Sequence, residues 1–500
     1  MAMTYESYWR QYAYNEQGPH FYSLEEMKKT LMKEELGGMR QHVSGIPLIK
    51  EGDTVFVSNR DDHAIVFGQT ASKKSRAVVI PAIVSHAYAG RSMIITDVKG
   101  ELCTNPKVIG LLRDQGYAIR YVDFRTFKAD GYNVFAGAFK AYRRGDPGNA
   151  FRIFNSVISS LVLLYSDSSV DKFWGSMAGQ HLMGCVGFLL PLFALNKGYE
   201  KYMNMSTLAC LTDEQGTQVM ERIVNSYLNH VNNNYLQMLR NVLSAPDKTR
   251  SSIVATSAAI MRDFMVQEDL MNMLSNSTFQ IEDLYERQAA VFLIIPDEVS
   301  TYDTIAGFLM DGMYEQLVSY HALRFSQKKA PCDIAWVCDE VCNLMINDMR
   351  AKISASRSRQ MRWLLICQSK KQLEDVYREN AATIIGNCRN KLFLQSSDMD
   401  MLRYISECTG TIPCESGSEP LATVEMLQNL KKSKEGKEAV YLSDNVCFKA
   451  DLADFDQYEC LKKFAGVDAA IPVVDRGRTS SYTPGMLAKD LSSGKIRLPW

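Results

Sequence analysis

The chain has 500 residues, of which 46% are hydrophobic, and a formal net charge of −1 with 23% charged residues. This length and apolar content can bury a large core, and at roughly 150 residues per domain they indicate two to four domains. The balanced charge excludes the strongly basic footprint of a protein that coats nucleic acid. Contact with DNA would therefore have to be local, for instance in the central channel of an oligomer.

The first 55 residues are polar, aromatic and mixed in charge, and we interpret residues 1–55 as an N-terminal arm outside the core. Residues 1–17 hold no apolar stretch behind a basic start, so no secretory signal is predicted. The longest uncharged apolar run, residues 182–195, contains Pro191 and is shorter than the roughly 20 residues that a bilayer crossing needs. This run favours a buried helix, and the sequence predicts a cytoplasmic protein.

From residue 64 onward, apolar strands alternate with segments of helical spacing. Residues 64–67, 92–96 and 117–122 are predicted strands, and residues 77–87 and 104–115 are predicted helices between them. Strands that alternate with helices imply an α/β fold with a mainly parallel, helix-covered sheet.

The strand pattern stops near residue 132 and returns near residue 290. In between, apolar residues recur at three- and four-residue spacing, which predicts an all-helical insertion at residues 145–244. Beyond residue 473 the chain carries Gly, Ser and Pro with little periodicity, so we expect a loosely ordered tail. The later predicted strands are residues 290–295, 334–338, 363–367, 391–394 and 439–442, with a long helix at 305–325.

The first strand leads into an altered phosphate-binding loop. Such a loop follows G-x-x-x-x-G-K-S/T because backbone N–H groups curl round the phosphates, the lysine reaches the β and γ oxygens and the hydroxyl binds Mg²⁺. Gly68, Lys74 and Ser75 keep three of these features, but Lys73 replaces the second glycine. A side chain there costs about 1–2 kcal/mol in a left-handed conformation, although its positive charge offsets part of the loss. We expect an impaired loop that still binds nucleotide through Gly68, Thr70, Ser72, Lys73, Lys74 and Ser75.

Two later strands end in residues that ATP hydrolysis needs. Asp339 and Glu340 follow residues 334–338, and Gln368 follows residues 363–367. Because carboxyl ends of parallel strands face one crevice, these side chains are expected to meet the phosphate loop. Asp339 and Ser75 would hold the metal, Glu340 would polarise the attacking water and Gln368 would sense the γ-phosphate. An acidic helix start and a polar strand end remain the alternatives.

Two arginines, Arg357 and Arg359, precede the second of these strands. In ring ATPases an arginine from the neighbouring subunit stabilises charge on the transferring phosphoryl group. Arg357 is the better candidate for this catalytic role and Arg359 the second. A solvated basic turn or a contact with DNA phosphates is the alternative interpretation.

Together these motifs resemble the type IV secretion coupling proteins, the TraG-like conjugation ATPases. The resemblance covers roughly residues 60–460 and includes Asp97-x-Lys99-Gly100-Glu101, Asp123-Phe124, Tyr132-Asn133, Asp339-Glu340, Ala355-Ser356-Arg357-Ser358-Arg359 and Gln368-Ser369. It implies a RecA-like P-loop NTPase with an inserted all-α domain, which assembles as a homo-hexamer round a channel. It also implies ATP and Mg²⁺ as cofactors.

The resemblance also implies a division of the chain. The N-terminal arm would be residues 1–55, the RecA-like nucleotide-binding domain residues 56–144 and 245–465, the inserted helical domain 145–244 and the C-terminal tail 466–500. Most members of the family begin with membrane-spanning helices, and none is visible here. Attachment at the inner face of the cell membrane would then come from a partner.

The leading interpretation is a cytosolic motor that delivers relaxase-bound DNA, or protein substrates, to a type IV secretion channel by using ATP. Its partners would be the relaxosome, the transferred DNA and the channel ATPase or inner-membrane subunits. Two alternatives stay open. One is a nucleotide-independent substrate adaptor with a degenerate loop, and the other is a soluble DNA pump of the FtsK or HerA kind.

Overall fold

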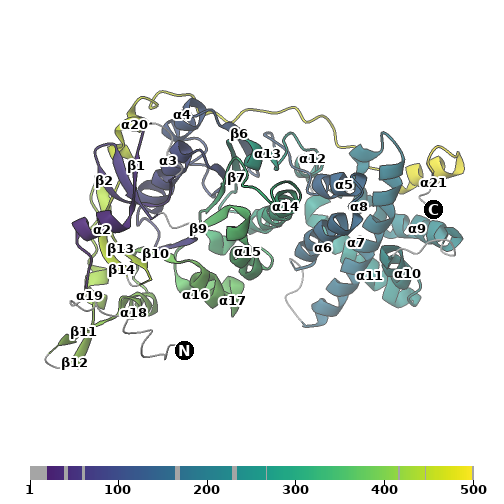
Figure 1. Cartoon of the computed structure of the whole chain (residues 1–500). Helices are drawn as coiled ribbons and strands as arrows, with labels where there is room; N and C mark the ends of the chain where they lie inside the picture. The colour runs from purple at the N-terminus through teal and green to yellow at the C-terminus, as the bar shows by residue number, and fades with distance from the viewer. Residues whose placement is uncertain are drawn as a thin grey trace, which may run out of the picture.

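The computed structural model describes residues 20–38, 43–58, 62–163, 169–227, 234–265, 267–414, 417–444 and 446–497. Residues 1–19 of the expected arm, and residues 164–168 and 228–233 of the expected insertion, lie outside these ranges. Figure 1 shows an α/β part built round a large sheet and, beside it, a part made of helices.

The large sheet has nine strands in the order β14-β13-β10-β4-β9-β8-β5-β7-β6. Every neighbouring pair from β10 to β6 is parallel, whereas the hairpin β13–β14 joins β10 antiparallel. The predicted α/β fold with a mainly parallel sheet is thus confirmed. The strands are β4 (Ala64–Gly68), β5 (Ser92–Asp97), β6 (Ala118–Asp123), β7 (Ala289–Ile294), β8 (Ile334–Cys338), β9 (Met361–Cys367), β10 (Asn390–Gln395), β13 (Gly436–Ser443) and β14 (Val446–Ala453).

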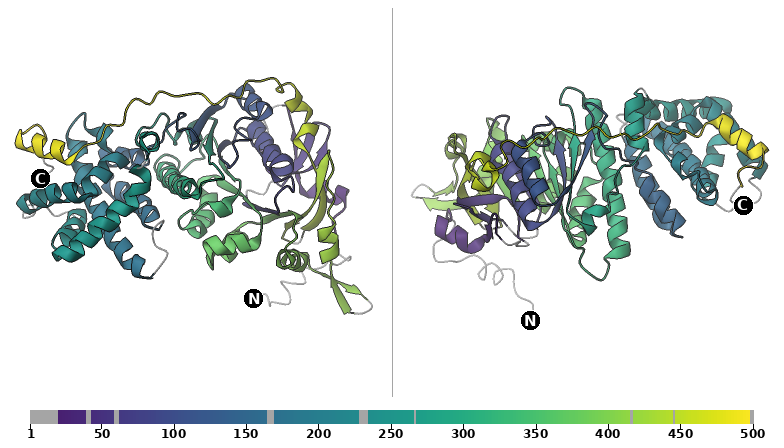
Figure 2. Two further views of the ribbon diagram at one scale, coloured as in Figure 1. Left: turned by 180° about the vertical axis from the view of Figure 1, so that it is seen from behind. Right: turned by 90° about the horizontal axis from the view of Figure 1, so that it is seen from above.

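Helices cover both faces of this sheet because successive strand residues point to opposite sides. Ile65 and Phe67 of β4 join the apolar core on one face, and Val66 joins the core on the other. Both layers are visible in Figure 2. On the first face lie α14 (Ser300–Arg324), α15 (Met349–Ser356), α16 (Lys370–Tyr377), α17 (Asn380–Asn387) and α18 (Met399–Cys408), and on the second α3 (Ile80–Ala89) and α4 (Pro106–Asp114).

The described residues 20–38 and 43–58 form elements that pack on the core, so the predicted arm outside the core is wrong for them. They form α2 (Leu24–Thr30) and a three-stranded antiparallel sheet of β1 (Met32–Glu35), β2 (Pro47–Glu51) and β3 (Thr54–Val57). Met27, Leu48 and Val55 are buried in the same apolar cluster as α3. All three strands are only four or five residues long, and β1 and β2 carry charged residues, which is why no long apolar run marks them in the sequence.

The helical part is longer than the expected 145–244. Its central helix, α7, contains a stretch, Lys172–Leu195, that is long and apolar enough to cross a membrane, but 78% of its apolar window is buried in the protein. A Cβ added at Gly187 of α7 would lie 2.2 Å from Cβ of Tyr235, so glycine allows α10 to pack this closely. The helices are α5 (Ala136–Arg143), α6 (Pro147–Leu163), α7 (Ser169–Leu195), α8 (Met205–Thr212), α9 (Glu214–Tyr227), α10 (Asn234–Leu243), α11 (Asp247–Met265) and α12 (Glu268–Ser275).

The C-terminal segment forms a strap, residues 468–483, that runs from the α/β part to the helical part and ends in α21 (Pro484–Ser492), as Figure 1 shows in yellow. Val474 N–H donates to the carbonyl of Lys128 over 2.8 Å, and Nε of Arg476 donates to Asn272 Oδ1 over 3.0 Å. Tyr482 is buried among aromatic rings of the helical part. The predicted loose tail is therefore wrong for the described residues up to 497, because contacts with distant loops hold a segment that has no periodicity of its own.

A buried charged cluster joins the helical part to the segment that follows β8. Asp311 Oδ1 of α14 lies 3.4 Å from Lys352 Nζ of α15, and Ser160 Oγ of α6 donates to Asp311 Oδ2 over 2.7 Å. The same oxygen accepts from Asn347 N–H at 3.0 Å. Burial raises the pKa of Asp311 to about 6, against the opposing effect of Lys352.

This cluster makes Lys352→Met a strongly destabilising substitution. The free energy of unfolding should fall by about 3–5 kcal/mol, because a buried carboxylate loses its cation. The loss should be larger at pH 8 than at pH 5, since Asp311 can take up a proton at the lower pH. Urea denaturation measures both effects. The double variant Lys352→Met/Asp311→Asn should recover most of the loss, and equal stability of the single and double variants would contradict the pairing.

Candidate nucleotide-binding site

Three strands of the sheet end beside one cleft. The loop after β4, the loop after β5 and the two acidic residues after β8 meet there, because parallel strands place their carboxyl ends at one edge. Pairing of Thr96 with Cys338 brings the ends of β5 and β8 level. The cleft is lined by Thr70, Ala71, Ser72, Lys73, Lys74, Ser75, Arg76, Asp97, Val98, Lys99, Glu101, Leu102, Asp339 and Glu340.

The loop after β4 adopts a curled backbone although it lacks two glycines. Ala71 and Lys73 have φ of 62° and 67°, a left-handed conformation that costs a non-glycine residue about 1–2 kcal/mol. Where residues in left-handed and right-handed backbone conformations alternate, their successive N–H groups point toward the same anion. Gly68 leaves room for the loop, since a Cβ there would lie 2.6 Å from Ser72 Oγ and 3.1 Å from Leu394 Cδ1, and both side chains would have to shift.

Lys74 and Ser75 stand at the start of the helix that follows the loop. Ser75 opens one turn of π-helix, η1 (Ser75–Val79), which continues directly into α3. Lys74 Nζ donates to the Gly68 carbonyl over 2.7 Å, which places its ammonium under the loop. Burial lowers the pKa of Lys74, and the nearby carboxylates of Asp339 and Glu340 oppose that shift. The helix N-terminus and this cation together favour a bound phosphate.

Ser75 and Asp339 form the pair that would hold a metal. Ser75 Oγ donates to Asp339 Oδ2 over 3.5 Å, while the buried Asp339 Oδ1 has no hydrogen-bond partner among the described residues. Burial and the neighbouring Glu340 raise the pKa of Asp339 to about 6. A divalent cation would be a positively charged partner for the unpartnered oxygen of Asp339. Hydroxyl and carboxylate oxygens are the ligands that Mg²⁺ prefers. The residues present therefore fit Mg²⁺.

Glu340 and Gln368 lie at the same edge of the sheet but at different depths. Glu340 lines the cleft at φ 52° and opens the short helix η4 (Val341–Asn343), where its Oε2 accepts from Asn343 Nδ2 over 3.4 Å. Gln368 follows Cys367, which pairs with Phe67, so it lies level with Gly68. Its Oε1 accepts from Gln372 Nε2 over 3.4 Å, and it does not line the cleft.

Arg357 and Arg359 lie at the opposite edge of the sheet from the phosphate loop. They form the short helix η5 (Arg357–Arg359) just before β9 begins, whereas the loop follows the end of β4. Arg357 makes an ion pair with Asp62 at 3.1 Å, and 56% of its side chain is exposed. Arg359 Nη1 donates to the Ala355 carbonyl over 2.7 Å. Neither arginine can reach the cleft of its own chain.

The cleft also contains residues that were not among the sequence candidates. Asp97 Oδ2 accepts from the N–H groups of Leu102 and Cys103 at 3.0 and 2.8 Å, so this carboxylate shapes the loop after β5. Lys99 and Glu101 of that loop line the cleft. The rule that pointed to Asp339, a polar residue at the carboxyl end of an apolar strand, applies equally to Asp97 and could have found this loop.

Solved structures of a plasmid coupling protein and of VirB4 have a similar fold. The plasmid coupling protein TrwB in complex with the ATP analogue ADPNP is 15% identical over 92% of this chain and 96% of its own, with a TM-score of 0.62. TrwB with ADP and Mg²⁺ is 14% identical over 87% and 93%, with a TM-score of 0.60. VirB4 of Thermoanaerobacter pseudethanolicus is 13% identical over 85% and 100%, with a TM-score of 0.51. The RecA-like P-loop fold is thus confirmed.

Sequence comparison is more specific than these fold similarities. A search of curated proteins gave no significant match. The profile of the family described as "Type IV secretory system Conjugative DNA transfer", however, matches residues 21–445, which is most of the 500-residue chain. The protein therefore belongs to the type IV secretory system conjugative DNA transfer family.

Proposed function

We propose that this protein is a coupling-protein motor that binds ATP and Mg²⁺ at the cleft and uses hydrolysis to move relaxase-bound DNA into a type IV secretion channel. One observation carries the proposal: Lys74 and Ser75 of a curled phosphate loop lie at the same cleft as Asp339 and Glu340. TrwB, which shares the fold, has been solved with ADPNP and with ADP and Mg²⁺.

The cleft provides most of the groups that phosphoryl transfer to water requires. The curled N–H groups and Lys74 would hold the β- and γ-phosphates, and Ser75 and Asp339 would hold Mg²⁺, which would neutralise charge on the transferring group. Glu340 orients and polarises the attacking water. Gln368 lies level with Gly68 but outside the cleft lining, so its amide would have to turn away from Gln372 to sense the γ-phosphate.

A ring of subunits supplies the remaining positive charge. Arg357 lies at the amino edge of the sheet and the phosphate loop at the carboxyl edge, so a head-to-tail ring brings the arginine of one subunit to the cleft of the next. We propose that Arg357 acts on the neighbouring subunit in such a ring, and we take a homo-hexamer as its form because the family resemblance implies one.

The helical part is the proposed docking site for the relaxosome, at the inner face of the membrane beside the channel subunits.

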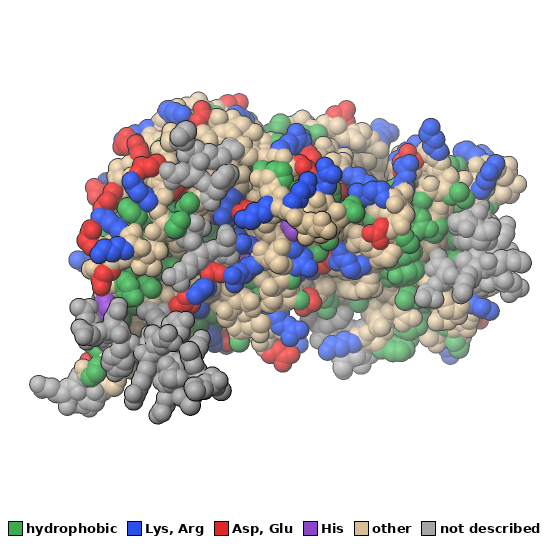
Figure 3. All heavy atoms as spheres, in the orientation of Figure 1, with side chains coloured by type: hydrophobic (Ala, Val, Ile, Leu, Met, Phe, Trp, Pro, Cys, Tyr) green, Lys and Arg blue, Asp and Glu red, His purple; other side chains and the backbone are tan. Residues whose placement is uncertain are grey.

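Figure 3 shows Lys and Arg side chains interspersed with Asp and Glu over one face of the molecule. With a net charge of −1, DNA binding would be confined to local contacts such as a ring channel.

One alternative has a structural basis. Two non-glycine residues at positive φ weaken nucleotide binding by about tenfold for each 1.4 kcal/mol that is not offset. A large enough loss would leave a substrate adaptor that works without nucleotide.

Replacement of Lys74 distinguishes the motor from the adaptor. Lys74→Ala should abolish ATP turnover and lower conjugative transfer at least a hundredfold, because the cation beneath the phosphates is lost. Phosphate release and mating frequency measure the two effects. Lys371→Ala, an exposed lysine on α16, is the control and should change neither. Normal transfer by the Lys74 variant would establish the adaptor.

The position of Arg357 predicts complementation between subunits. Arg357→Ala and Lys74→Ala proteins should each be inactive alone, while a mixture should regain a measurable fraction of wild-type turnover. Some interfaces in the mixture pair an intact loop with an intact arginine. Turnover by the Arg357→Ala protein alone at the wild-type rate, or no recovery on mixing, would exclude Arg357 as the residue that acts across the interface.

A further inference from the structure

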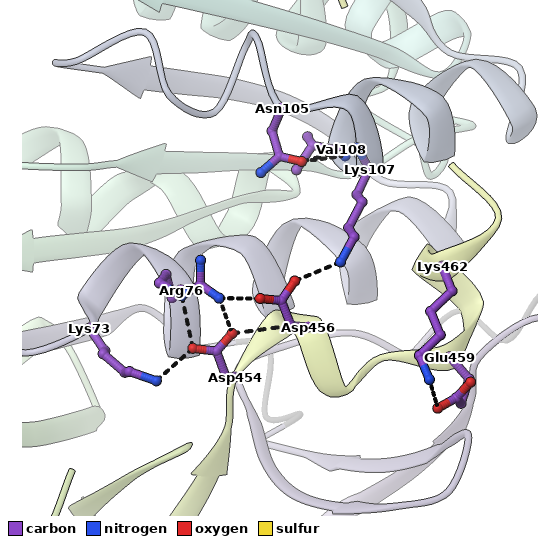
Figure 4. A network of polar contacts seen from close by, with 9 residues as sticks. All are labelled: Lys73, Arg76, Asn105, Lys107, Val108, Asp454, Asp456, Glu459 and Lys462. Atoms are coloured by element: carbon purple, nitrogen blue, oxygen red, sulfur yellow. Dashed lines mark hydrogen bonds and ion pairs between the residues drawn. The ribbon is translucent and has the colours of Figure 1, made fainter. Parts of the chain in front are cut away.

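A segment near the C-terminal end of the α/β part binds the phosphate loop from outside the cleft. Lys73, which replaces the second glycine of the loop, directs its ammonium to Asp454, with 2.8 Å between Nζ and Oδ2. The same Nζ donates to the Lys434 carbonyl over 3.1 Å. Figure 4 shows Lys73 and Arg76 converging on Asp454, which follows β14 directly.

Asp454 is built to hold a charge at this place. Its side chain is 0% exposed, and it accepts from Arg76 Nε at 2.9 Å and from Arg76 Nη2 at 2.6 Å. Burial opposes ionisation, but the hydrogen bonds from Arg76 and Lys73 keep the pKa of Asp454 below its ordinary value. The Arg76 guanidinium also lies over the Phe455 ring, 4.4 Å from its centre. Charge-assisted bonds to a buried carboxylate are stronger and more directional than exposed ion pairs.

The other left-handed residue of the loop is held from the same side. Lys432 Nζ donates to the Ala71 carbonyl over 2.5 Å. Asp456, two residues after Asp454, binds Arg76 and lies 2.6 Å from Lys107 Nζ at the start of α4. The segment from residue 432 to 456 thus contacts both strained positions of the phosphate loop and the helix behind the other wall of the cleft.

We propose that Asp454 is a positioning residue for nucleotide binding: by anchoring Lys73, it keeps the phosphate loop curled in a sequence that lacks the glycines which adopt that shape without strain. This inference rests on the proposed function. The inference also gives the two neighbouring lysines different roles. The Lys73 ammonium binds Asp454, and Lys74 contacts the phosphates.

Removal of the charge on Asp454 should weaken nucleotide binding. Asp454→Asn keeps the shape of the side chain, and we expect Mg²⁺–ADPNP affinity, measured by calorimetry, to fall about tenfold. Asp451→Asn, which removes an exposed carboxylate of β14 three residues earlier, is the matched control and should bind like the wild type. Unchanged affinity in Asp454→Asn beside a normally binding wild type would overturn the inference and leave the proposed function intact.

A second variant separates positioning from general stabilisation. In Lys73→Gly/Asp454→Asn the glycine adopts positive φ without strain, so affinity should return to within about threefold of the wild-type value. If Asp454 only stabilised the fold through Arg76, the double variant would bind as weakly as Asp454→Asn, and the positioning role would be refuted.

The loop can also be observed without any nucleotide. Hydrogen–deuterium exchange in a peptide that covers residues 64–79 should be faster in Asp454→Asn than in Asp451→Asn, and slower again in the double variant. Equal exchange in the two single variants would overturn the inference. If the wild type bound no nucleotide, the proposed function would fail, and exchange would still decide whether Asp454 holds the loop.

Discussion

The phosphate loop is under a conformational constraint that glycine usually removes. Ala71 and Lys73 both stand at positive φ, and the direction of every N–H group that could hold a phosphate depends on that shape. Lys74 and Ser75 follow at once, so their approach to Gly68 and Asp339 depends on it as well. In this protein, contacts of Asp454 with Lys73 and of Lys432 with Ala71 hold the loop in that shape. Glycines at positions 71 and 73 would adopt it without such contacts.

Because most strands of the large sheet run parallel, its two edges carry different functional residues. Carboxyl ends of β4, β5 and β8 form the cleft, whereas the amino ends carry the arginines before β9. In the proposed hydrolysis, neither edge is complete by itself. The buried Asp311–Lys352 pair then connects the segment after Glu340 to α6 of the helical part, which gives the cleft a packed connection to the proposed substrate side.

Much of the sheet and the centre of the cleft could be predicted from sequence for physical reasons. Parallel strands buried on both faces are continuous apolar runs, so β4, β8 and β9 are visible, and the residues that follow them, including Asp339, fall at a known edge. The antiparallel β14 was missed because its buried and exposed residues alternate toward the end. The role of Asp454 could not be predicted, because its partner Lys73 is 381 residues away in the chain.

The C-terminal strap has a mechanical consequence. It leaves the α/β part near α20 (Glu459–Lys462), is fixed at Lys128 and Asn272 on the way, and ends in α21 against the helical part. An extended chain has almost no slack, since about 3.3–3.6 Å per residue is its limit. The strap is therefore a second connection between the two parts, and its length limits how far they can move apart.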